Sequence, residues 1–541
     1  MEAKKKLKLP AGIQTFEEII NQGYVYVDKT QYLVNLIDTG KIYFLARPRR
    51  FGKSLTVSTF DALFSGEKKL FKGLYAEEFV NRPDYQPSPV IRLDMSKVTT
   101  DRGIEGLYES MQNLTRAAAK KLNVELSETQ LSGDLLGELI ATAANKYNQK
   151  VVMLIDEYDK PYTDFFNDST MAETVRKALR NYYSQIKAAD EYIRFTFFTG
   201  ISKFTRMGVF STLNTMTDIS MSPKYAEICG YTEDEITCYF PDYLEETASY
   251  MKMSVYELIE KMRYYYNGFS FDREAKARLY NPHSTLLFFQ DMSFANFWIE
   301  TGTSKVIADF MKDRNLTVEQ FIDYPVSVDF VRSPGDMDKT PPEGFLYQAG
   351  YLTLRPGKTD DLSLDYPNTE VLNAMSEMVT QNMLAYKDES YHHCRADALD
   401  GLWNKNSKIL IGAFNRLLAS IPYDDYESAA RQGMSNKKVD MKPQEWLFRN
   451  AIQSFLQGCG VMVASEVHTN KGRADLVVSY RGNLWVIEIK VARDGSNANR
   501  KAKEAYRQII KNNYAAPYTN AICLGLCIDD KERQITASFS S

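Results

Sequence analysis

GRADLVVSYRGNLWVIEIKVA, residues 472–492, is the stretch that decides the fold of the last part of the chain. Two apolar runs flank a short Arg-Gly-Asn turn, a pattern that predicts two neighbouring strands. Asp475 begins the first strand, and Glu488 and Lys490 lie on the second. Because side chains two residues apart in a strand share a face, Glu488 and Lys490 project to the same side. The tight turn predicts that Asp475 stands close to Glu488.

The residue types at this hairpin predict a metal-dependent site. Two carboxylates that meet at a sheet edge, Asp475 and Glu488, make a hard-oxygen site for Mg²⁺ or Mn²⁺. Such an ion stabilises negative charge in a transition state and lowers the pKa of bound water. Lys490 would orient or deprotonate that water, or offset phosphate charge. The alternative is a structural ion pair of Glu488 with Lys490 inside an otherwise apolar strand.

The flanking sequence predicts a compact α/β module around the hairpin. Its expected elements are an amphipathic helix at 443–457, a strand at 461–467, a helix at 504–514 and a strand at 521–529. Glu445 on the first helix is predicted to approach the same metal. Gln508 on the second helix is predicted to form hydrogen bonds near it.

The charge of this module differs from that of the rest of the chain. Residues 436–541 contain 16 Lys and Arg against 10 Asp and Glu, a net charge of +6. Because the whole chain carries −4, the remainder carries −10. A basic module on an acidic chain indicates a polyanionic partner such as DNA or RNA. An uneven but merely solvated surface is the alternative.

A second site is predicted upstream, where the strand KIYFLA (41–46) runs into RPRRFGKSL (47–55) and a helix at 54–64. A phosphate-binding loop wraps phosphates with backbone N–H groups, neutralises them with Lys and holds Mg²⁺ with Ser or Thr. Lys53 and Ser54 match the end of that pattern. Arg47 stands where the first glycine of the loop is usual.

Two further strands support this site. KVVMLIDEYD (150–159) ends in Asp156, expected to complete a Mg²⁺ shell, and Glu157, expected to polarise an attacking water. YIRFTFFTG (192–200) ends near polar residues, Thr199 to Ser202, that could sense a phosphate. With a strand at 90–96 and a helical stretch at 102–148, these runs predict a parallel sheet buried on both faces.

The middle of the chain, residues 220–430, reads as mostly helical, with an exposed loop or boundary at 333–344. We therefore expect a multidomain α/β chain: a P-loop NTPase domain at 8–290, a helical linking region at 291–430 and an α/β domain at 431–541. The six cysteines form no CxxC pair, and neither a secretory signal nor a membrane-spanning apolar run is evident. These features favour a cytoplasmic protein without a membrane partner.

The first part resembles the AAA-ATPase-like family. The resemblance rests on GYVYVDKT (23–30), RPRRFGKSL, LIDEYD, TGISKF (199–204), NGFSF (267–271) and YNPHS (280–284). It implies a P-loop ATPase fold that binds ATP with Mg²⁺. The residues implied at the nucleotide are Arg49, Arg50, Phe51, Gly52, Lys53, Ser54, Leu55 and Asp156, with Glu157 catalytic. Arg47, Arg49 and Arg50 are candidates for phosphate contacts within or across subunits, so a homo-oligomer is left open.

The last part resembles the PD-(D/E)xK nuclease superfamily over about residues 440–535, through GRADLVV and VIEIKVA. Ala474 stands where that motif usually has proline. The resemblance implies a restriction-endonuclease-like fold with Asp475, Glu488 and Lys490 catalytic, supported by Glu445 and Gln508. The leading hypothesis is therefore an ATP-driven or ATP-regulated nuclease acting on DNA or RNA. The alternatives are a non-cleaving nucleic-acid-binding or signalling ATPase that uses the nuclease fold for docking, and a nucleotide-binding regulator without a nucleic-acid partner.

Overall fold

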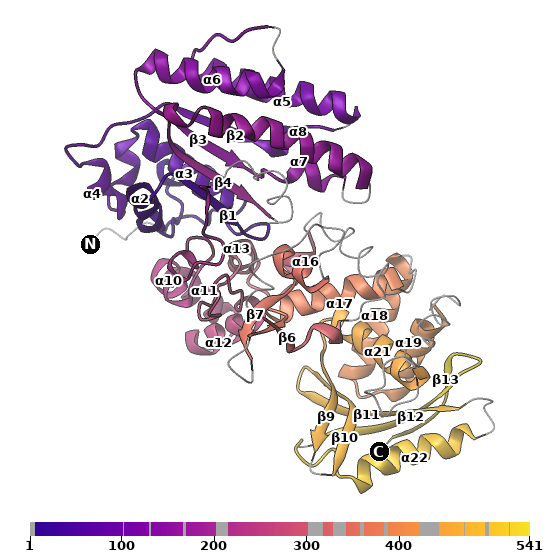
Figure 1. Ribbon diagram of the computed structural model, residues 1–541. Helices are drawn as coiled ribbons and strands as arrows, with labels where there is room; N and C mark the ends of the chain where they lie inside the picture. The colour runs from indigo at the N-terminus through magenta and orange to yellow at the C-terminus, as the bar shows by residue number, and fades with distance from the viewer. Residues whose placement is uncertain are drawn as a thin grey trace, which may run out of the picture. The chain divides into compact units, whose positions relative to one another are not determined.

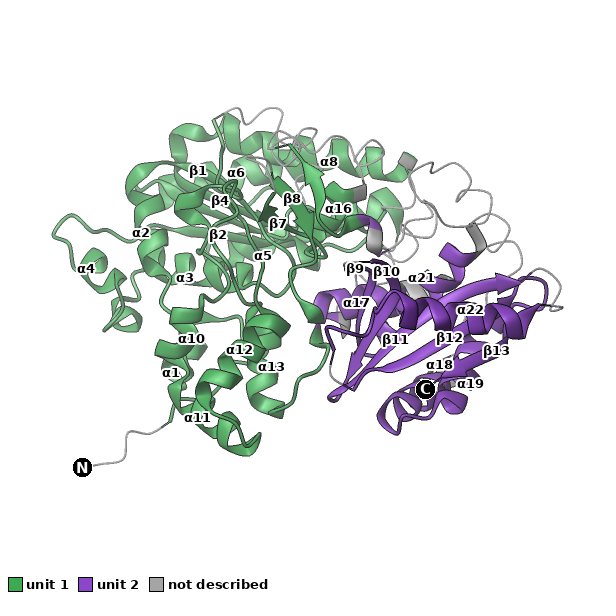
Figure 2. Cartoon of the chain, turned by 90° about the horizontal axis from the view of Figure 1, so that it is seen from below, with its two compact units in different colours: residues 1–297, 321–369 green, residues 298–320, 370–541 purple. Residues whose placement is uncertain are grey.

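The computed structural model describes residues 6–100, 102–128, 131–165, 169–201, 215–300, 318–327, 342–357, 362–383, 388–420, 443–469, 471–492, 497–518 and 520–540. The chain divides into two compact units, Met1–Phe297 with Phe321–Thr369 and Trp298–Gln320 with Glu370–Ser541 (Figure 2). The three-part division predicted from the sequence stays a prediction.

The first unit is built on a parallel sheet of five strands in the order β2-β3-β4-β1-β5 (Figure 1). The strands are β1 Ile42–Ala46, β2 Val90–Asp94, β3 Val151–Asp156, β4 Ile193–Gly200 and β5 Thr217–Asp218. Every residue of β1 and β3 is buried because helices cover both faces of the sheet, which explains their continuous apolar runs. The predicted parallel sheet is confirmed.

The covering helices divide between the two faces. Helix α3 (Lys53–Ser65) packs Phe60 against Phe195 and Phe197 of β4 on one face. Helices α5 (Gly103–Lys121), α6 (Ser132–Tyr147) and α8 (Ser169–Ala188) share a core with the other face (Figure 1). The predicted helical stretch 102–148 is therefore two helices. Helix α5 ends just before Asn123, whose left-handed backbone (φ 50°) stops helical hydrogen bonding.

The remaining elements of the first unit are mostly short helices. They are α1 Phe16–Asn21, α2 Thr30–Thr39, α4 Ala76–Val80, α7 Lys160–Thr163, α10 Glu233–Tyr239, α11 Pro241–Tyr250, α12 Val255–Tyr266, α13 Pro282–Asp291 and α16 Pro342–Ala349. Single 3-10 turns lie at Lys68–Phe71, Met95–Lys97, Asp190–Tyr192 and Pro223–Tyr225. Two more, Phe297–Glu300 and Glu319–Phe321, span the points in the sequence where one unit gives way to the other. Helices α10 to α13 share a separate aromatic core around Phe240, Tyr266 and Phe288.

A small antiparallel sheet follows that the sequence did not predict. Its strands are β6 Tyr324–Val326, β7 Thr353–Pro356 and β8 Leu362–Asp365, in the order β6-β8-β7. Strands of three or four residues are too short to show the alternation that identifies a strand, so the region reads as helical. Most of the loop predicted at 333–344 lies outside the described residues, and α16 begins within it at Pro342.

The second unit contains a mixed sheet of five strands in the order β13-β12-β11-β10-β9 (Figure 1). The strands are β9 Met462–Thr469, β10 Gly472–Tyr480, β11 Asn483–Ala492, β12 Ile522–Asp529 and β13 Gln534–Ser540. The other neighbouring strands run antiparallel, but β11 and β12 run parallel. A parallel pair needs a long crossover, which α22 (Ala498–Lys511) provides between β11 and β12. The predicted C-terminal α/β domain is confirmed.

Helices enclose this sheet on both sides. α21 (Pro443–Gly458), α18 (Asp388–Trp403) and α19 (Ser407–Ala419) share a core with one face, and α22 covers the other. Helix α17 (Thr369–Met383) precedes them. The last strand, β13, was not predicted. In the described parts of both units, no helix is both long and apolar enough to cross a membrane.

Candidate active sites

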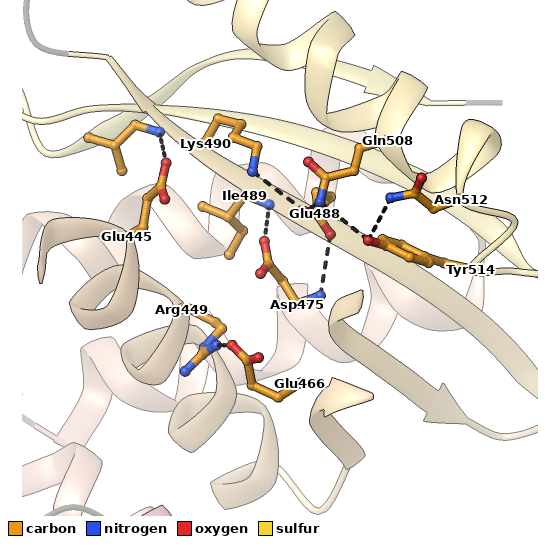
Figure 3. Close-up of polar contacts among 11 residues, drawn as sticks. Glu445, Arg449, Glu466, Asp475, Glu488, Ile489, Lys490, Gln508, Asn512 and Tyr514 are labelled. Atoms are coloured by element: carbon orange, nitrogen blue, oxygen red, sulfur yellow. Dashed lines mark hydrogen bonds and ion pairs between the residues drawn. The ribbon is translucent and has the colours of Figure 1, made fainter. Parts of the chain in front are cut away.

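The hairpin β10–β11 brings Asp475 and Glu488 together, as the sequence predicted (Figure 3). Next to the paired residues Leu476 and Ile487, each carboxylate accepts a hydrogen bond from a backbone N–H of the other strand. Asp475 Oδ2 accepts the Ile489 N–H at 2.8 Å, and Glu488 Oε2 accepts the Asp475 N–H at 3.3 Å. Both side chains are held by backbone groups, so their positions follow directly from the hairpin.

Burial makes this pair of acids electrostatically unfavourable. Asp475 is 7% exposed and Glu488 only 1% exposed. Burial raises the pKa of Asp475, and burial together with the Asp475 charge raises the pKa of Glu488 to about 8. A bound cation would lower the free-energy cost of ionising these two adjacent carboxyl groups. Mg²⁺ and Mn²⁺ are the ions that prefer oxygen donors of this kind. The donor set therefore fits a divalent ion.

Lys490 lies at the open side of the pair. Its Nζ is 3.6 Å from Glu488 Oε1, and about a third of its side chain is exposed. The ion pair considered as an alternative from the sequence is thus present. Its length exceeds that of a charge-assisted hydrogen bond, about 2.7–2.9 Å. The ammonium can therefore reach a ligand without first breaking a tight contact.

Gln508 reaches the same carboxylate from α22. Its Nε2 donates to Glu488 Oε1 and lies 3.5 Å from the hydroxyl oxygen of Tyr514, which also accepts the Asn512 side-chain amide at 2.8 Å (Figure 3). Tyr514 lies against Gly472, because a Cβ on that glycine would come within 2.6 Å of the hydroxyl oxygen. The glycine of GRAD and the tyrosine after α22 thus fit together and hold Gln508 beside Glu488. The sequence did not single out Tyr514 or Asn512.

Glu445 lies nearby on α21 but has another partner. Its Oε1 accepts the Val491 N–H at 3.3 Å, on the strand that carries Glu488 and Lys490 (Figure 3). In the described part of the chain, no group of three or more His, Cys, Asp or Glu side chains gathers at one point. The direct approach of Glu445 to a metal therefore stays a prediction, and its visible contact is with strand β11.

The upstream site lies at the carboxyl ends of the parallel strands. After β1 the loop turns at Gly52, whose backbone is left-handed (φ 92°), and α3 begins at Lys53 without a side-chain cap. Free N–H groups at a helix start suit an anion. Lys53 Nζ donates to the carbonyl oxygens of Arg47 and Pro48 at 3.0 and 2.9 Å. Burial lowers the pKa of the Lys53 ammonium, while the carboxylates of Glu157 and Asp156 oppose that shift.

The two acids at the end of β3, Asp156 and Glu157, contribute to the electrostatic environment of Lys53. Asp156 is buried and accepts hydrogen bonds from the Thr199 hydroxyl and from the Glu157 N–H, the latter at 3.1 Å. Because β4 separates β1 from β3, Thr199 at the end of β4 lies between the loop and the acids. Burial raises the pKa of Glu157, and Lys53 opposes the shift. Ser202 lies outside the described residues, so a phosphate sensor there stays a prediction.

Comparisons with known proteins match each of the two domains to a family. Residues 10–210 match the family model described as Predicted AAA-ATPase, and residues 444–538 match that of the PD-(D/E)XK nuclease superfamily. "Uncharacterized protein in vnfD 5'region" of Azotobacter chroococcum mcd 1 is 32% identical over 521 residues, covering 94% of this chain and 93% of that protein. The chain belongs to the AAA-ATPase-like family with a C-terminal PD-(D/E)XK nuclease superfamily domain. Cdc6p from Pyrobaculum aerophilum has a TM-score of 0.23 at 10% identity, covering 68% of this chain and 97% of that chain.

In this AAA-ATPase-like chain, three residues of the loop between β1 and α3 contact other parts of the first unit: Arg47, Arg50 and Phe51. Arg47 is 1% exposed, and its guanidinium donates to the carbonyls of Ala46 and Ser220 at 2.9 and 2.8 Å. It also donates to the carbonyls at 225 and 226, at 3.1 and 3.3 Å, and its guanidinium carbon lies 4.4 Å from the centre of the Phe271 ring. Arg47 is therefore a structural residue of the loop. The sequence had made it a candidate for phosphate contact.

Phe51 and Arg50 also contact the rest of the first unit. Phe51 packs edge-on against Phe269 and Phe271 of the NGFSF segment, and Arg50 Nη1 contacts His283 Nε2. Burial and the Arg50 charge lower the pKa of His283 to about 4, so the ring accepts as neutral imidazole. The predicted nucleotide contacts of Arg49, Ser54 and Leu55 stay predictions. All three are partly exposed at or beside the loop.

The PD-(D/E)XK domain also holds an ion-pair cluster that the sequence did not suggest. Glu466 of β9 pairs with Arg449 of α21 and with Arg473 of β10, the latter at 3.0 Å. These residues come from separate elements, and no local spacing pattern links them. Only the tertiary fold brings them together.

Proposed function

We propose that this protein binds ATP in its first unit and hydrolyses phosphodiester bonds of nucleic acid in its second. The observation that carries the proposal is the buried pair Asp475 and Glu488, with Lys490 3.6 Å from Glu488. Membership of the two domain families supports both activities.

The second site has the groups that phosphodiester hydrolysis needs. Asp475 and Glu488 would hold Mg²⁺ or Mn²⁺, which would supply a bound water of lowered pKa and offset charge on the phosphate. Hydrolysis forms a bond from water oxygen to phosphorus and breaks one phosphorus–oxygen bond, and the leaving oxygen finally takes a proton. Lys490 is placed to orient the water or to bind a phosphate oxygen, because its ammonium stands at the exposed side of Glu488. Gln508 keeps the Glu488 carboxylate in place through its amide.

A nucleic-acid partner is supported by the surface of the same domain. The exposed face of α22 carries basic residues at spacings of three or four, which places them on one side of the helix: Arg500, Lys503, Arg507 and Lys511. Cations in such a row attract a phosphate backbone without reading its sequence. We therefore infer binding through the backbone and assign no sequence preference.

The first unit supports ATP binding on chemical grounds. Lys53 is a buried cation at the start of α3, and Asp156 and Glu157 lie at the end of the nearby strand β3. Lys53 would contact phosphate oxygens, Asp156 with Ser54 would hold Mg²⁺, and Glu157 would orient water for hydrolysis of ATP. We further propose that ATP binding controls cleavage at the second site.

The test is cleavage of labelled DNA and RNA by the full chain with Mg²⁺ or Mn²⁺. We expect Asp475→Asn, Glu488→Gln and Lys490→Ala to lose activity at least about a hundredfold. Glu532→Gln is the matched control, because it removes an exposed acid from the turn after β12. Equal cleavage by wild type and site variants would reject the assignment. Salt-sensitive binding without cleavage under any metal would favour the docking alternative.

ATP control is tested by the same assay with ATP, a non-hydrolysable analogue or no nucleotide. We expect Lys53→Met to abolish the nucleotide dependence and leave metal-dependent cleavage measurable. A cleavage rate that ignores nucleotide in the wild-type chain would reject the coupling and leave the nuclease assignment standing. The homo-oligomer left open by the sequence stays a prediction, and sedimentation with and without ATP would test it.

A further inference from the structure

Two arginines converge on one carboxylate beside the candidate nuclease site. Arg449 Nη1 contacts Glu466 Oε1 (Figure 3). Arg473 Nη1 lies 3.0 Å from Glu466 Oε2, so each carboxylate oxygen pairs with one guanidinium. A guanidinium presents the same pair of donors to a carboxylate and to a phosphate. Glu466 therefore occupies the position that a phosphate group would take between two arginines.

The cluster adjoins the carboxylate pair through the strands themselves. Arg473 precedes Asp475 by two residues on β10. On β9, Ser465 and Val467 pair with Leu476 and Ala474, which places Glu466 opposite Asp475. Arg449 lies one helical turn beyond Glu445 on α21. A nucleic-acid strand with one phosphate at Asp475 and Glu488 would thus bring a neighbouring phosphate towards the two arginines.

Two features of the cluster lower the stability of the domain, which indicates that the cluster serves a function other than folding. Glu466 has a left-handed backbone (φ 50°) in the middle of a strand, a conformation that costs about 1 kcal/mol or more for a residue other than glycine. Arg449 is 5% exposed, and its Nε has no hydrogen-bond partner among the described residues. Arg473, by contrast, has 46% of its side chain exposed, and Lys471 and His468 beside it are exposed too. The cluster is anchored inside the domain and open to an incoming anion.

We propose that Arg449 and Arg473 bind a phosphodiester group of nucleic acid next to the one at the Asp475–Glu488 pair, and that Glu466 occupies this site until nucleic acid displaces it. The inference rests on the proposed function and deepens it by assigning a phosphate site. The three side chains together carry +1, and neutralising Glu466 leaves +2 for the phosphate. Removing this acid should therefore tighten binding of nucleic acid.

The experiment is fluorescence anisotropy of short labelled DNA and RNA with the full chain in EDTA, so that no cleavage occurs. We expect Glu466→Gln to bind about three- to tenfold more tightly than wild type. Arg473→Gln should bind more weakly by a similar factor and lower the slope of log K against log salt by about one. Arg473→Lys keeps the charge but loses the two-pronged donor, so it should also bind more weakly.

A matched control separates this site from a general gain in positive charge. Glu532→Gln removes one exposed acid from the turn after β12 of the same domain. Glu466→Gln binding no more tightly than Glu532→Gln would overturn the inference. If Glu466→Gln unfolds, unchanged binding by Arg473→Gln and Arg473→Lys overturns it in the same way. Failure of the wild-type chain to bind any nucleic acid would instead reject the proposed function as well.

Discussion

Replacing Arg47 by glycine would give the phosphate loop the residue that is usual at this position, yet we expect Arg47→Gly to damage the protein. The guanidinium donates to four carbonyl oxygens between 2.8 and 3.3 Å and stacks on Phe271. Glycine would leave buried carbonyls unpaired and open a cavity. The motif alone predicts that glycine here would leave stability and nucleotide binding unchanged or improved, whereas the observed contacts predict a loss of both.

The magnitude follows from these contacts. Hydrogen bonds from a charged donor contribute about 1.5–3 kcal/mol each, but burial of the guanidinium offsets much of that sum. Removing one member of a buried charged network commonly costs about 3–5 kcal/mol, and glycine adds backbone freedom of up to about 1 kcal/mol. We expect the first unit to lose about 3–6 kcal/mol in Arg47→Gly, mostly where Ser220, Tyr225 and Ala226 meet the loop.

Hydrogen exchange measured peptide by peptide is the assay. Peptides covering residues 220–226 should exchange faster in Arg47→Gly, and binding of a fluorescent ATP analogue should weaken. Arg49→Gly is the control for hydrogen exchange only, because Arg49 lies in the same loop with a partly exposed side chain. The four tryptophans, at positions 298, 403, 446 and 485, all lie in the second unit, so their fluorescence should not change. Wild-type protection at 220–226 with undiminished nucleotide binding would refute the reasoning.

Three further substitutions can be tested by tryptophan fluorescence or by binding of the fluorescent ATP analogue. Because burial raises the pKa of Glu488 to about 8, the folded chain keeps a proton that the unfolded chain releases near pH 4.5. The tryptophan-detected Tm in EDTA should therefore fall as pH rises from about 4.5 to 8, and Glu488→Gln should flatten that fall; parallel curves would contradict the shift. Lys53→Met should weaken binding of the fluorescent ATP analogue by about tenfold or more, because a buried cation at the helix start is lost; unchanged affinity would exclude Lys53 from the nucleotide site. Gly472→Ala should lower the Tm of the second unit more than Gly482→Ala, because a Cβ meets the Tyr514 hydroxyl at 2.6 Å in the first case and open space in the second; equal losses would mean that backbone strain alone matters.

The geometry of the second site was predictable where it depends on local rules. The alternation of a strand and a tight turn suffices to bring Asp475 to Glu488 and to place Lys490 beside them. Gln508 was predicted from its helix to form hydrogen bonds near the metal, and the structure places its amide on Glu488. Glu445 illustrates the limit, because its helix was predicted but its contact with the Val491 N–H depends on how α21 packs on the sheet. Nothing in the sequence near Arg449 or Glu466 predicts their ion pair, since they lie 17 positions apart on two different elements, α21 and β9.

The first unit shows a similar division between local and long-range information. Continuous apolar runs revealed β1, β3 and β4, since a parallel sheet buried on both faces has no polar alternation. The break after α5 and the short strands β6 to β8 were missed because a single left-handed Asn123 and strands of three or four residues leave weak signals. Arg47 was placed among possible phosphate ligands because a motif reports position along the chain. Which way a side chain turns depends on carbonyls more than 170 residues away.

The two sites share one physical feature, with opposite sign. Burial raises the pKa of Glu488 and lowers the pKa of Lys53, so each unit holds a charge that the fold alone disfavours. A cation at Glu488 and a polyphosphate at Lys53 would remove that cost, because each supplies the missing counter-charge. Ligand binding should therefore stabilise each unit by itself, and the gain from Mg²⁺ in the second unit should grow with pH as Glu488 loses its proton.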